Sequence, residues 1–313
     1  MTVVPHIIQN ESPSDELALL EVGDYGSGKS YLAATAPGTI LFFDFDQRAA
    51  ALRTHPNSKN IYSLTFADPT TTTAVPTAFN EMLAVLGQIE KSPLLRDLHA
   101  VFADQGERWI DTIVFDSIQT VSDSARRYVL FNGGTDQGGI TKEFRIGQQV
   151  YRVAKNWHAW GGEMEMVTGA VLQTRALMHC KQCAKSVTYT QEQNGKGRLF
   201  HTANPALDKD HAPVAKAMNV ICILHETMEE DERSTEENPI YTGKIAVFPV
   251  RYRVLLKYFN EVWRLTREMG GAPLISVDPD GKFTKAKSAL GIPKVKIPDI
   301  QQVLRDSKSM QKK

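Results

Sequence analysis

Residues 23–30, with the sequence GDYGSGKS, constrain the fold of this chain more than any other stretch. The spacing of its glycines, lysine and final serine is that of a phosphate-binding loop. The glycines let successive backbone N–H groups point at the phosphates of a nucleotide, the lysine reaches the terminal phosphates, and the serine binds Mg²⁺. We therefore predict that ATP and Mg²⁺ bind here, and that the nucleotide contacts Gly23, Asp24, Tyr25, Gly26, Ser27, Gly28, Lys29 and Ser30.

Short apolar stretches separated by longer, helix-compatible ones predict a mostly parallel central sheet. These stretches read LALLEV, TILFFDF, TIVFD, NVICILH, GKIAVFPV and EVWRLTR. Because they are apolar on both faces, helices should cover both sides of the sheet. With the phosphate-binding loop directly after the first strand, the pattern predicts a three-layer α/β P-loop NTPase fold, with the nucleotide at the carboxyl ends of the strands.

The second half of the predicted nucleotide site comes from three later strand ends. TIVFDS ends in Asp116, whose carboxylate either holds Mg²⁺ across from Ser30 or caps the next helix. LFFDFD supplies Asp44 and Asp46, which strand alternation puts on one face, and either could orient and deprotonate the attacking water. ICILHE places His225 where a polar side chain could sense the γ-phosphate.

Composition narrows the class of protein. The 313 residues carry 36 basic and 36 acidic side chains and three cysteines, an odd number that forms no disulfide framework. With no apolar run of about 18 residues and no signal peptide, we expect a cytoplasmic protein with no membrane partner. The charge is uneven: residues 282–313 hold nine basic and two acidic side chains, and residues 226–237 hold seven acidic and one basic. The basic end either follows a nucleic-acid backbone or is simply solvated.

The stretch between Thr141 and Trp160 predicts an amphipathic helix, preceded by a glycine-rich loop. Its apolar residues recur at intervals of three and four: Ile146, Val150, Val153, Trp157 and Trp160. A second set of residues at the same spacing is mostly basic: Lys142, Arg145, Gln149, Arg152 and Asn156. These residues form either a solvated helix face or a basic surface beside a nucleic-acid groove.

Residues 161–212 interrupt the alternation of strands and helices and predict an inserted small subdomain. HCKQC, with Cys180 and Cys183, followed by KSVTYTQ and NGKG, has the outline of half a zinc ribbon, and His201 and His211 are the candidates for the remaining Zn²⁺ ligands. The alternative is two ordinary thiols, because the sequence has no second C-x-x-C pair.

Taken together, these motifs resemble the RecA-like ATPase core, and more closely the phage-encoded ATPases of that type that act in single-strand annealing and recombination. The resemblance rests on GDYGSGKS, ILFFDFD, TIVFDS, VICILHE and the C-terminal run GKIAVFPV…FNEVWRLTRE…DGKFTKAKSALGIP. It covers about two thirds of the chain and leaves out the insertion. It implies a RecA-like ATPase core over residues 1–160 and 213–275, and a basic C-terminal extension over residues 276–313.

The resemblance also implies roles for single residues. Lys29 and Ser30 match the residues that bind phosphate and Mg²⁺, and Asp116 matches the acidic Mg²⁺ ligand. Asp46 stands where RecA-like proteins usually have a catalytic glutamate, and its shorter side chain implies slow turnover. His225 matches the end of the strand that senses the γ-phosphate.

Two lysines extend the implied site to a neighbouring subunit. Lys285 and Lys287 match a region that supplies a positive finger to the nucleotide of the next subunit, so hydrolysis would require a homo-oligomer, either a ring or a filament.

The sequence thus predicts a DNA-stimulated ATPase that acts on single-stranded DNA in phage recombination, annealing or repair. Trp157, Trp160 or Tyr189 could stack on bases, although the spacing of the tryptophans also fits a core. Two other functions stay open: a nucleotide-gated binding or scaffolding module with little turnover, and a small-molecule phosphotransferase. The acidic stretch 226–237 argues against the phosphotransferase, because an acidic lid repels a phosphorylated acceptor.

Overall fold

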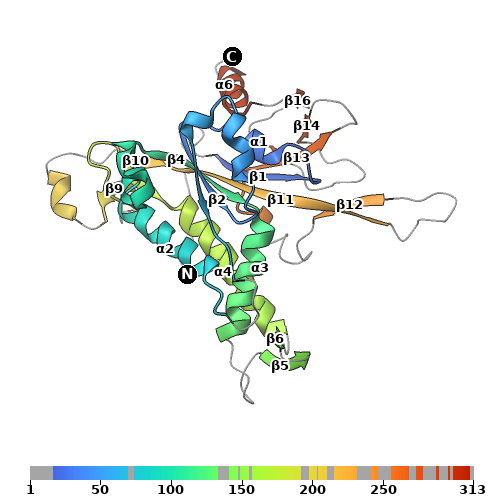
Figure 1. The fold of residues 1–313 in the computed structure, drawn as a ribbon. Helices are drawn as coiled ribbons and strands as arrows, with labels where there is room; N and C mark the ends of the chain where they lie inside the picture. The colour runs from blue at the N-terminus through green and yellow to red at the C-terminus, as the bar shows by residue number, and fades with distance from the viewer. Residues whose placement is uncertain are drawn as a thin grey trace.

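A ten-stranded sheet forms the centre of the molecule (Figure 1). In the computed structural model the described residues are 17–69, 74–132, 141–146, 149–154, 157–191, 197–202, 204–209, 215–230, 241–245, 255–267, 273–277, 287–288, 295–296 and 299–310. The strand order is β16-β14-β13-β1-β11-β4-β2-β3, with β12 paired to β11 and β15 paired to β13. From β13 to β3 all neighbouring strands run parallel, and β12, β14, β15 and β16 are antiparallel additions.

The bounds of the sheet strands are β1 Ala18–Gly23, β2 Thr39–Asp44, β3 Ile61–Thr65, β4 Ile110–Asp116, β11 Asn219–Glu230, β12 Tyr241–Ile245, β13 Glu261–Arg267, β14 Pro273–Ser276, β15 Lys287–Ser288 and β16 Val295–Lys296. The helices are α1 Lys29–Ala33, α2 Ala78–Lys91, α3 Ile118–Asn132, α4 Trp157–Arg175 and α6 Ile300–Met310, with 3₁₀ turns η1 Ala49–Thr54, η2 Ser58–Asn60, η3 Leu95–Asp97, η4 Ala100–Gln105 and η5 Pro205–Lys209.

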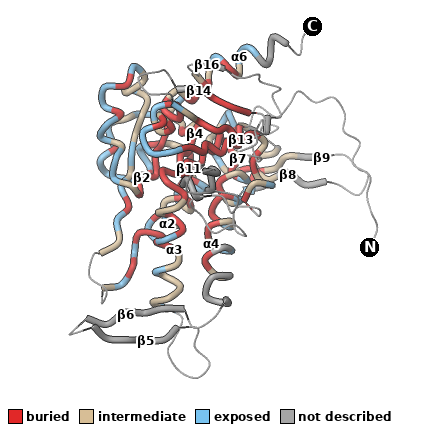
Figure 2. The backbone as a smooth tube through the Cα atoms, turned by 90° about the vertical axis from the view of Figure 1, so that its right-hand side faces the viewer, coloured by how far each residue is buried: buried red, intermediate tan, exposed pale blue. Residues whose placement is uncertain are grey.

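Helices cover both faces of the sheet because its strands are apolar on both sides. Phe42 and Phe43 are neighbours in β2, are fully buried, and point to opposite faces. Phe43 belongs to a core that includes residues of α2, α3 and α4, whereas Phe42 packs in a second core with residues of α1 and α6. Figure 2 shows the buried residues along the strands and along the helix sides that face them. The predicted three-layer α/β P-loop NTPase fold is confirmed.

The strands predicted from apolar stretches are confirmed at β1, β2, β4, β11 and β13. GKIAVFPV is described only as far as Ile245, where it forms the end of β12. Strand β3 was not predicted, because its five residues, IYSLT, include two polar side chains and none of the five is fully buried. None of the helices within the described ranges combines the length and apolar character that a membrane span needs.

The predicted helix between Thr141 and Trp160 is wrong. These residues form an antiparallel hairpin of β5 Thr141–Ile146 and β6 Gln149–Ala154, and α4 begins only at Trp157. The sequence KEFRI…QVYRV alternates apolar and polar residues and is rich in aromatic and β-branched side chains, which favours a strand over a helix. The supposed basic strip of a helix is therefore divided between two strands, and Asn156 lies outside the described residues.

Residues 178–217 form a small group of short strands at one edge of the sheet. Its strands are β7 Met178–Cys180, β8 Val187–Gln191, β9 Gly197–His201 and β10 Ala215–Ala217. β7 pairs with β10, and β8 pairs with β9. Helix α4 runs continuously across residue 161 and contributes Val167 and Val171 to the core. The start of the insertion at residue 161 stays a prediction, and the structure has a core helix at that position.

Candidate nucleotide site

The loop between β1 and α1 has the conformation that its glycines were predicted to serve. Gly26 and Gly28 have φ angles of 75° and 94°, in the left-handed region that favours glycine. At Gly23 a Cβ atom would lie 2.4 Å from the carbonyl oxygen of Leu265 and 2.8 Å from Ser27 Oγ. The loop can therefore follow this path only with glycine at these positions.

Lys29 lies inside this loop. Its Nζ donates to the carbonyl oxygens of Gly23 and Asp24, both at 2.8 Å, and only 5% of the residue is exposed. Burial lowers the pKa of Lys29 to about 8, although the nearby Glu21 and Asp116 favour the charged form. The ammonium group is thus held by the loop backbone at the position that the motif predicts.

Ser30 and Asp116 meet across an intervening strand. β11 lies between β1 and β4, yet Ser30 Oγ donates to Asp116 Oδ2 at 2.7 Å. Burial raises the pKa of Asp116 to about 6, opposed by the hydrogen bond from Ser30 and assisted by the nearby Asp46 and Asp44. A hydroxyl and a carboxylate in contact form the kind of oxygen donor set that Mg²⁺ takes in proteins, so these residues fit the metal.

Asp44 and Asp46 have different surroundings. Both Asp44 oxygens accept backbone N–H groups at the start of η1, from Arg48 at 2.9 Å and Ala49 at 3.0 Å. Asp46 instead accepts hydrogen bonds from Ser117, Thr120 and His225. The expectation that both carboxylates share a face is wrong, because β2 ends at Asp44 and strand alternation does not continue to Asp46.

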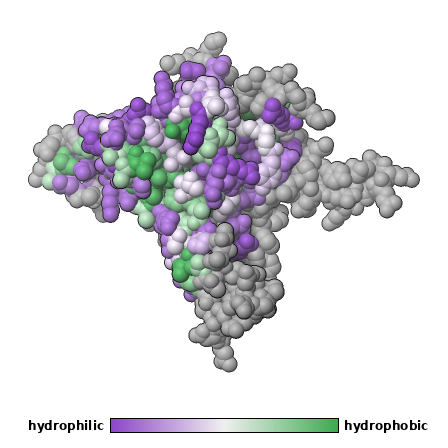
Figure 3. Space-filling view, in the orientation of Figure 1, coloured by the Kyte–Doolittle hydropathy of each residue, from purple (hydrophilic) through white to green (hydrophobic). Residues whose placement is uncertain are grey.

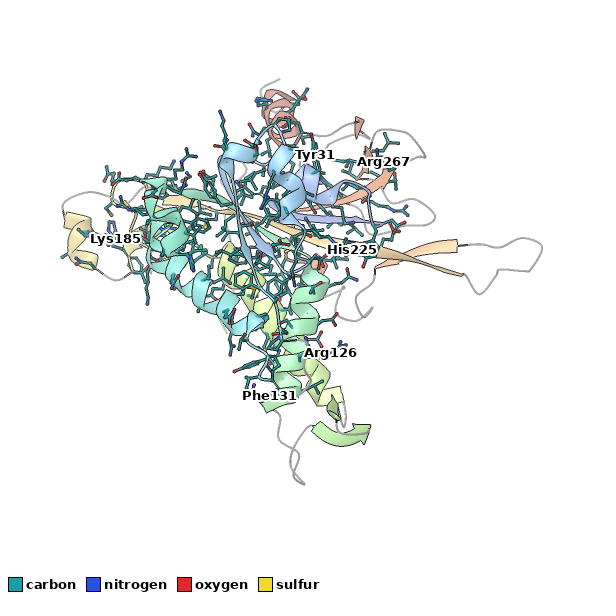
Figure 4. The ribbon with its side chains drawn as sticks, viewed as in Figure 1. Tyr31, Arg126, Phe131, Lys185, His225 and Arg267 are labelled. Atoms are coloured by element: carbon teal, nitrogen blue, oxygen red, sulfur yellow. The ribbon has the colours of Figure 1, made fainter. Side chains whose placement is uncertain are left out.

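A hollow of about 390 Å³ opens at the carboxyl ends of β2, β4 and β11. Its lining includes Tyr25, Asp46, Arg48, Ser117, Thr120 and His225. His225 Nε2 lies 3.2 Å from Asp46 Oδ2, and the backbone N–H of His225 donates to Gln119 Oε1 at 2.9 Å. Figure 4 marks His225 at this edge of the sheet, beside the first turn of α3.

The ring of Tyr25 covers His225 from the loop side. The two rings stack with their centroids 4.0 Å apart, and the guanidinium of Arg48 lies 5.5 Å from the centre of the tyrosine ring. More than half of Tyr25 is exposed. The loop thus contacts the strand end through a side chain that we predicted only as part of the nucleotide-binding backbone.

Sequence reasoning missed several residues that the structure brings to this hollow. Arg48 and Thr120 follow Asp46 and Asp116 by two and four residues, so their nearness to the strand ends was the available signal.

Other predicted residues are not placed at the site. Lys285 lies outside the described residues, and Lys287 is described only as part of β15, where it pairs with Val262.

The cysteine and histidine residues predicted as zinc ligands lie away from the nucleotide site. Cys180, Cys183 and His201 are brought together near β7 and β9. His211 lies outside the described residues. Figure 4 shows the separation, with Lys185 of this region and His225 on opposite sides of the molecule.

Comparison with known protein families agrees with this geometry. The family described as an AAA domain matches residues 16–196, more than half of the chain and including the loop and Asp116. The chain belongs to the AAA domain family. It is therefore an AAA-type P-loop ATPase domain. Domains of this type generally bind and hydrolyse nucleotides. No curated protein matches the sequence.

A buried glutamate lies beneath the loop of this AAA domain. Glu21 is in β1 between Leu20 and Val22, is 0% exposed, and neither of its carboxyl oxygens has a hydrogen-bond partner among the described residues. Burial raises the pKa of Glu21 well above its usual range, although nearby Lys29 opposes the shift. The neutral form of its carboxyl group therefore persists to a higher pH than that of an exposed glutamate.

Replacing Glu21 should change how stability depends on pH. Its folded pKa exceeds the unfolded value of about 4.3, so the stability that its proton provides is complete below about pH 4.3 and is lost as the pH rises toward the folded pKa. Glu21→Gln removes this loss, and we expect Tm at pH 8 to rise by at least about 2–4 °C, the effect of roughly 1 kcal/mol in a domain of this size.

The measurement is thermal unfolding at several pH values between 5 and 8. The gain from Glu21→Gln should shrink as the pH falls. Glu81→Gln, at an exposed position of α2, serves as the control and should shift Tm little at any pH. A Glu21→Gln gain that does not vary with pH, or a loss of stability, contradicts the assignment of a neutral buried carboxyl.

Proposed function

We propose that this AAA domain hydrolyses ATP on single-stranded DNA, as a homo-oligomer that acts in recombination, annealing or repair. The contact between Ser30 and Asp116, beside Lys29 in its loop, is the observation that carries the ATPase part. The DNA part is supported by the resemblance of the motifs and by the residues of the β5–β6 hairpin.

The chemistry follows from the positions of the side chains. Lys29 contacts the terminal phosphates from inside the loop, and Ser30 and Asp116 hold the metal through oxygen atoms. Bound Mg²⁺ neutralises charge on the phosphates and orients them. The hollow beside Asp46 and His225 then lies next to the terminal phosphate and receives the attacking water.

Asp46 is our candidate for orienting that water. Burial alone would raise the pKa of Asp46, but the hydrogen bonds from His225, Thr120 and Ser117 outweigh it and lower the pKa to about 2. Such a carboxylate stays ionised at neutral pH and is a weak proton acceptor, so it positions the water better than it deprotonates it. Slow turnover follows, as the replacement of glutamate by aspartate also implies.

His225 is our candidate for sensing the terminal phosphate. It bridges Asp46 and Tyr25 at the point where β11 passes Gly23 of the loop. Nδ1 of His225 has no hydrogen-bond partner among the described residues. A phosphate that draws this imidazole away from Asp46 therefore changes the position of β11 and of the β12 strand paired with it.

The β5–β6 hairpin is our candidate surface for single-stranded DNA. Phe144 and Tyr151 are directly opposed in its register, and Lys142 occupies the same face two residues before Phe144. Aromatic residues interleaved with basic ones are typical of proteins on which bases stack while cations meet phosphates. Figure 1 shows the hairpin at the far ends of α3 and α4, away from the central sheet.

The oligomer is supported by the resemblance around Lys285 and Lys287. A cation from one subunit that reaches the nucleotide of the next offsets charge on the transferred phosphoryl group, and it makes hydrolysis depend on assembly.

A second candidate is a nucleotide-gated binding module with little turnover. The low pKa of Asp46 favours it, because hydrolysis without an effective base is slow. A small-molecule phosphotransferase has less support, because residues 226–230 of the acidic stretch belong to a strand paired with β12, an arrangement unlike a phosphate-binding lid.

The first test is ATP hydrolysis with and without single-stranded DNA. Lys29→Ala should reduce hydrolysis by at least about 100-fold and abolish stimulation by DNA, because it removes the cation at the terminal phosphates. Lys59→Ala, an exposed lysine of η2, is the matched control and should behave as wild type. ATP bound without DNA stimulation in the wild type favours the nucleotide-gated module, and no DNA binding in any nucleotide state refutes the DNA part.

A second test separates the two aspartates. Asp46→Asn should lower kcat by about 10²-fold or more while ATP still binds, since it removes the charge that orients the water. Asp44→Asn keeps an oxygen for the N–H groups of Arg48 and Ala49, so its kcat should stay within a few-fold of wild type. The opposite pattern, with Asp44→Asn inactive and Asp46→Asn active, refutes the assignment.

A third test addresses the hairpin. Phe144→Ala with Tyr151→Ala should weaken binding to single-stranded DNA about tenfold or more, the effect expected from loss of base stacking. ATP hydrolysis without DNA should not change, because the hairpin is remote from the loop. The matched control is Thr141→Ala with Val150→Ala on the other face of the hairpin, and equal loss of affinity in both pairs contradicts stacking.

A further inference from the structure

Two cysteines and a histidine converge in the group of short strands at the edge of the sheet. The ligand atoms of Cys180, Cys183 and His201 all lie within 4.8 Å of one another, and Cys183 Sγ is 3.2 Å from His201 Nε2. Cys180 and His201 are fully buried, and Cys183 is partly buried. A buried cluster of two thiols and an imidazole is a donor set that Zn²⁺ prefers.

The backbone between the two cysteines directs both sulfur atoms to one point. The N–H of Ala184 donates to the carbonyl of Cys180 at 2.9 Å, and the N–H of Cys180 donates to the carbonyl of Lys185 at 2.8 Å. Ala184 has a φ of 56°, a left-handed conformation in which the chain reverses directly after Cys183.

The histidine is oriented by a carboxylate on its other side. His201 Nδ1 lies 2.6 Å from Asp208 Oδ1, and this oxygen also accepts the backbone N–H of His201 at 3.1 Å. The contact fixes the ring so that Nε2 faces Cys183. A carboxylate that holds one imidazole nitrogen while the other binds a metal is the usual outer shell of a zinc site.

We propose that Cys180, Cys183 and His201 supply three of the four ligands of a structural Zn²⁺ ion, with Asp208 as the positioning residue of His201. Neither cysteine forms a disulfide with another described residue. The ligands come from the end of β7, the turn after it and the end of β9, so the metal joins two separate strand pairs. Asp208 belongs to η5, so its contact with His201 connects this 3₁₀ turn to the metal site.

The position of the cluster assigns it a structural role. Next to Cys180, His179 Nε2 contacts the carbonyl oxygens of Ile89 and Glu90 at the end of α2, which ties β7 to the core. β10 pairs with β7 and leads directly into β11, where His225 lies six residues after the first residue of the strand, Asn219. The metal therefore lies at the amino ends of the strands, whereas the nucleotide site lies at their carboxyl ends.

The test is the metal content of the full-length protein after purification under reducing conditions with Zn²⁺ supplied. We expect about one Zn²⁺ per chain in the wild type and less than about one tenth of that in Cys183→Ser and His201→Ala. Asp208→Asn should weaken zinc affinity by about 10–100-fold without abolishing it. Cys222→Ala removes a thiol buried in β11 and is the matched control that keeps full zinc content.

Substitution of the wild-type protein with Co²⁺ gives a readout that does not depend on whether a variant folds. We expect the absorption bands of tetrahedral cobalt with thiolate ligands. Absence of stoichiometric metal in the wild type, a Cys180–Cys183 disulfide in place of metal, or full zinc content in Cys183→Ser would each overturn the proposal. None of these measurements involves nucleotide, so failure here and failure of the ATPase proposal are independent.

Discussion

The parallel pairing of β11 with β1 and β4 sets the distances on which the nucleotide site depends. In this register Gly23 lies opposite His225, and Cys222 lies opposite Phe115, one residue before Asp116. Because β1 and β4 end at the same level of the sheet and His225 lies at that level within β11, the loop, the acidic strand end and the histidine converge there. Asp116 then reaches Ser30 across the width of one intervening strand.

This convergence concentrates ionisable groups in a space with little water. Asp116 and Asp46 both act electrostatically on Lys29, and the lysine is the cation that these two carboxylates share. The site lowers the free-energy cost of burying charged groups by keeping the Glu21 carboxyl neutral and by giving Asp46 three hydrogen bonds. Around it the described surface is mostly hydrophilic, with small scattered apolar patches (Figure 3).

The sequence predicted the parts of the fold in which one signal dominates. Strands such as TILFFDF are apolar on both faces, and the loop motif is specific in spacing, so both were located correctly. The β5–β6 hairpin was mistaken for a helix because Ile146, Val150 and Val153 happen to recur at three and four residues within an alternating pattern. Glu21 escaped notice because its neighbours make LALLEV read as an ordinary buried strand, and only burial with no hydrogen-bond partner in the described chain makes it unusual.

The long strand β11 has two mechanically different halves. β1 pairs with residues 220–225 and β4 pairs with residues 219–222, and sliding by one residue would turn every side chain to the opposite face. From Glu226 onward only β12 pairs with the strand, and a two-stranded ribbon bends far more easily than a packed sheet. Glu226 itself is fixed to Arg264 of β13 by two hydrogen bonds at 2.8 and 2.9 Å. The ion pair thus fixes β11 one residue beyond His225, so any bending of the ribbon would begin beyond this point and leave the register of the sheet unchanged.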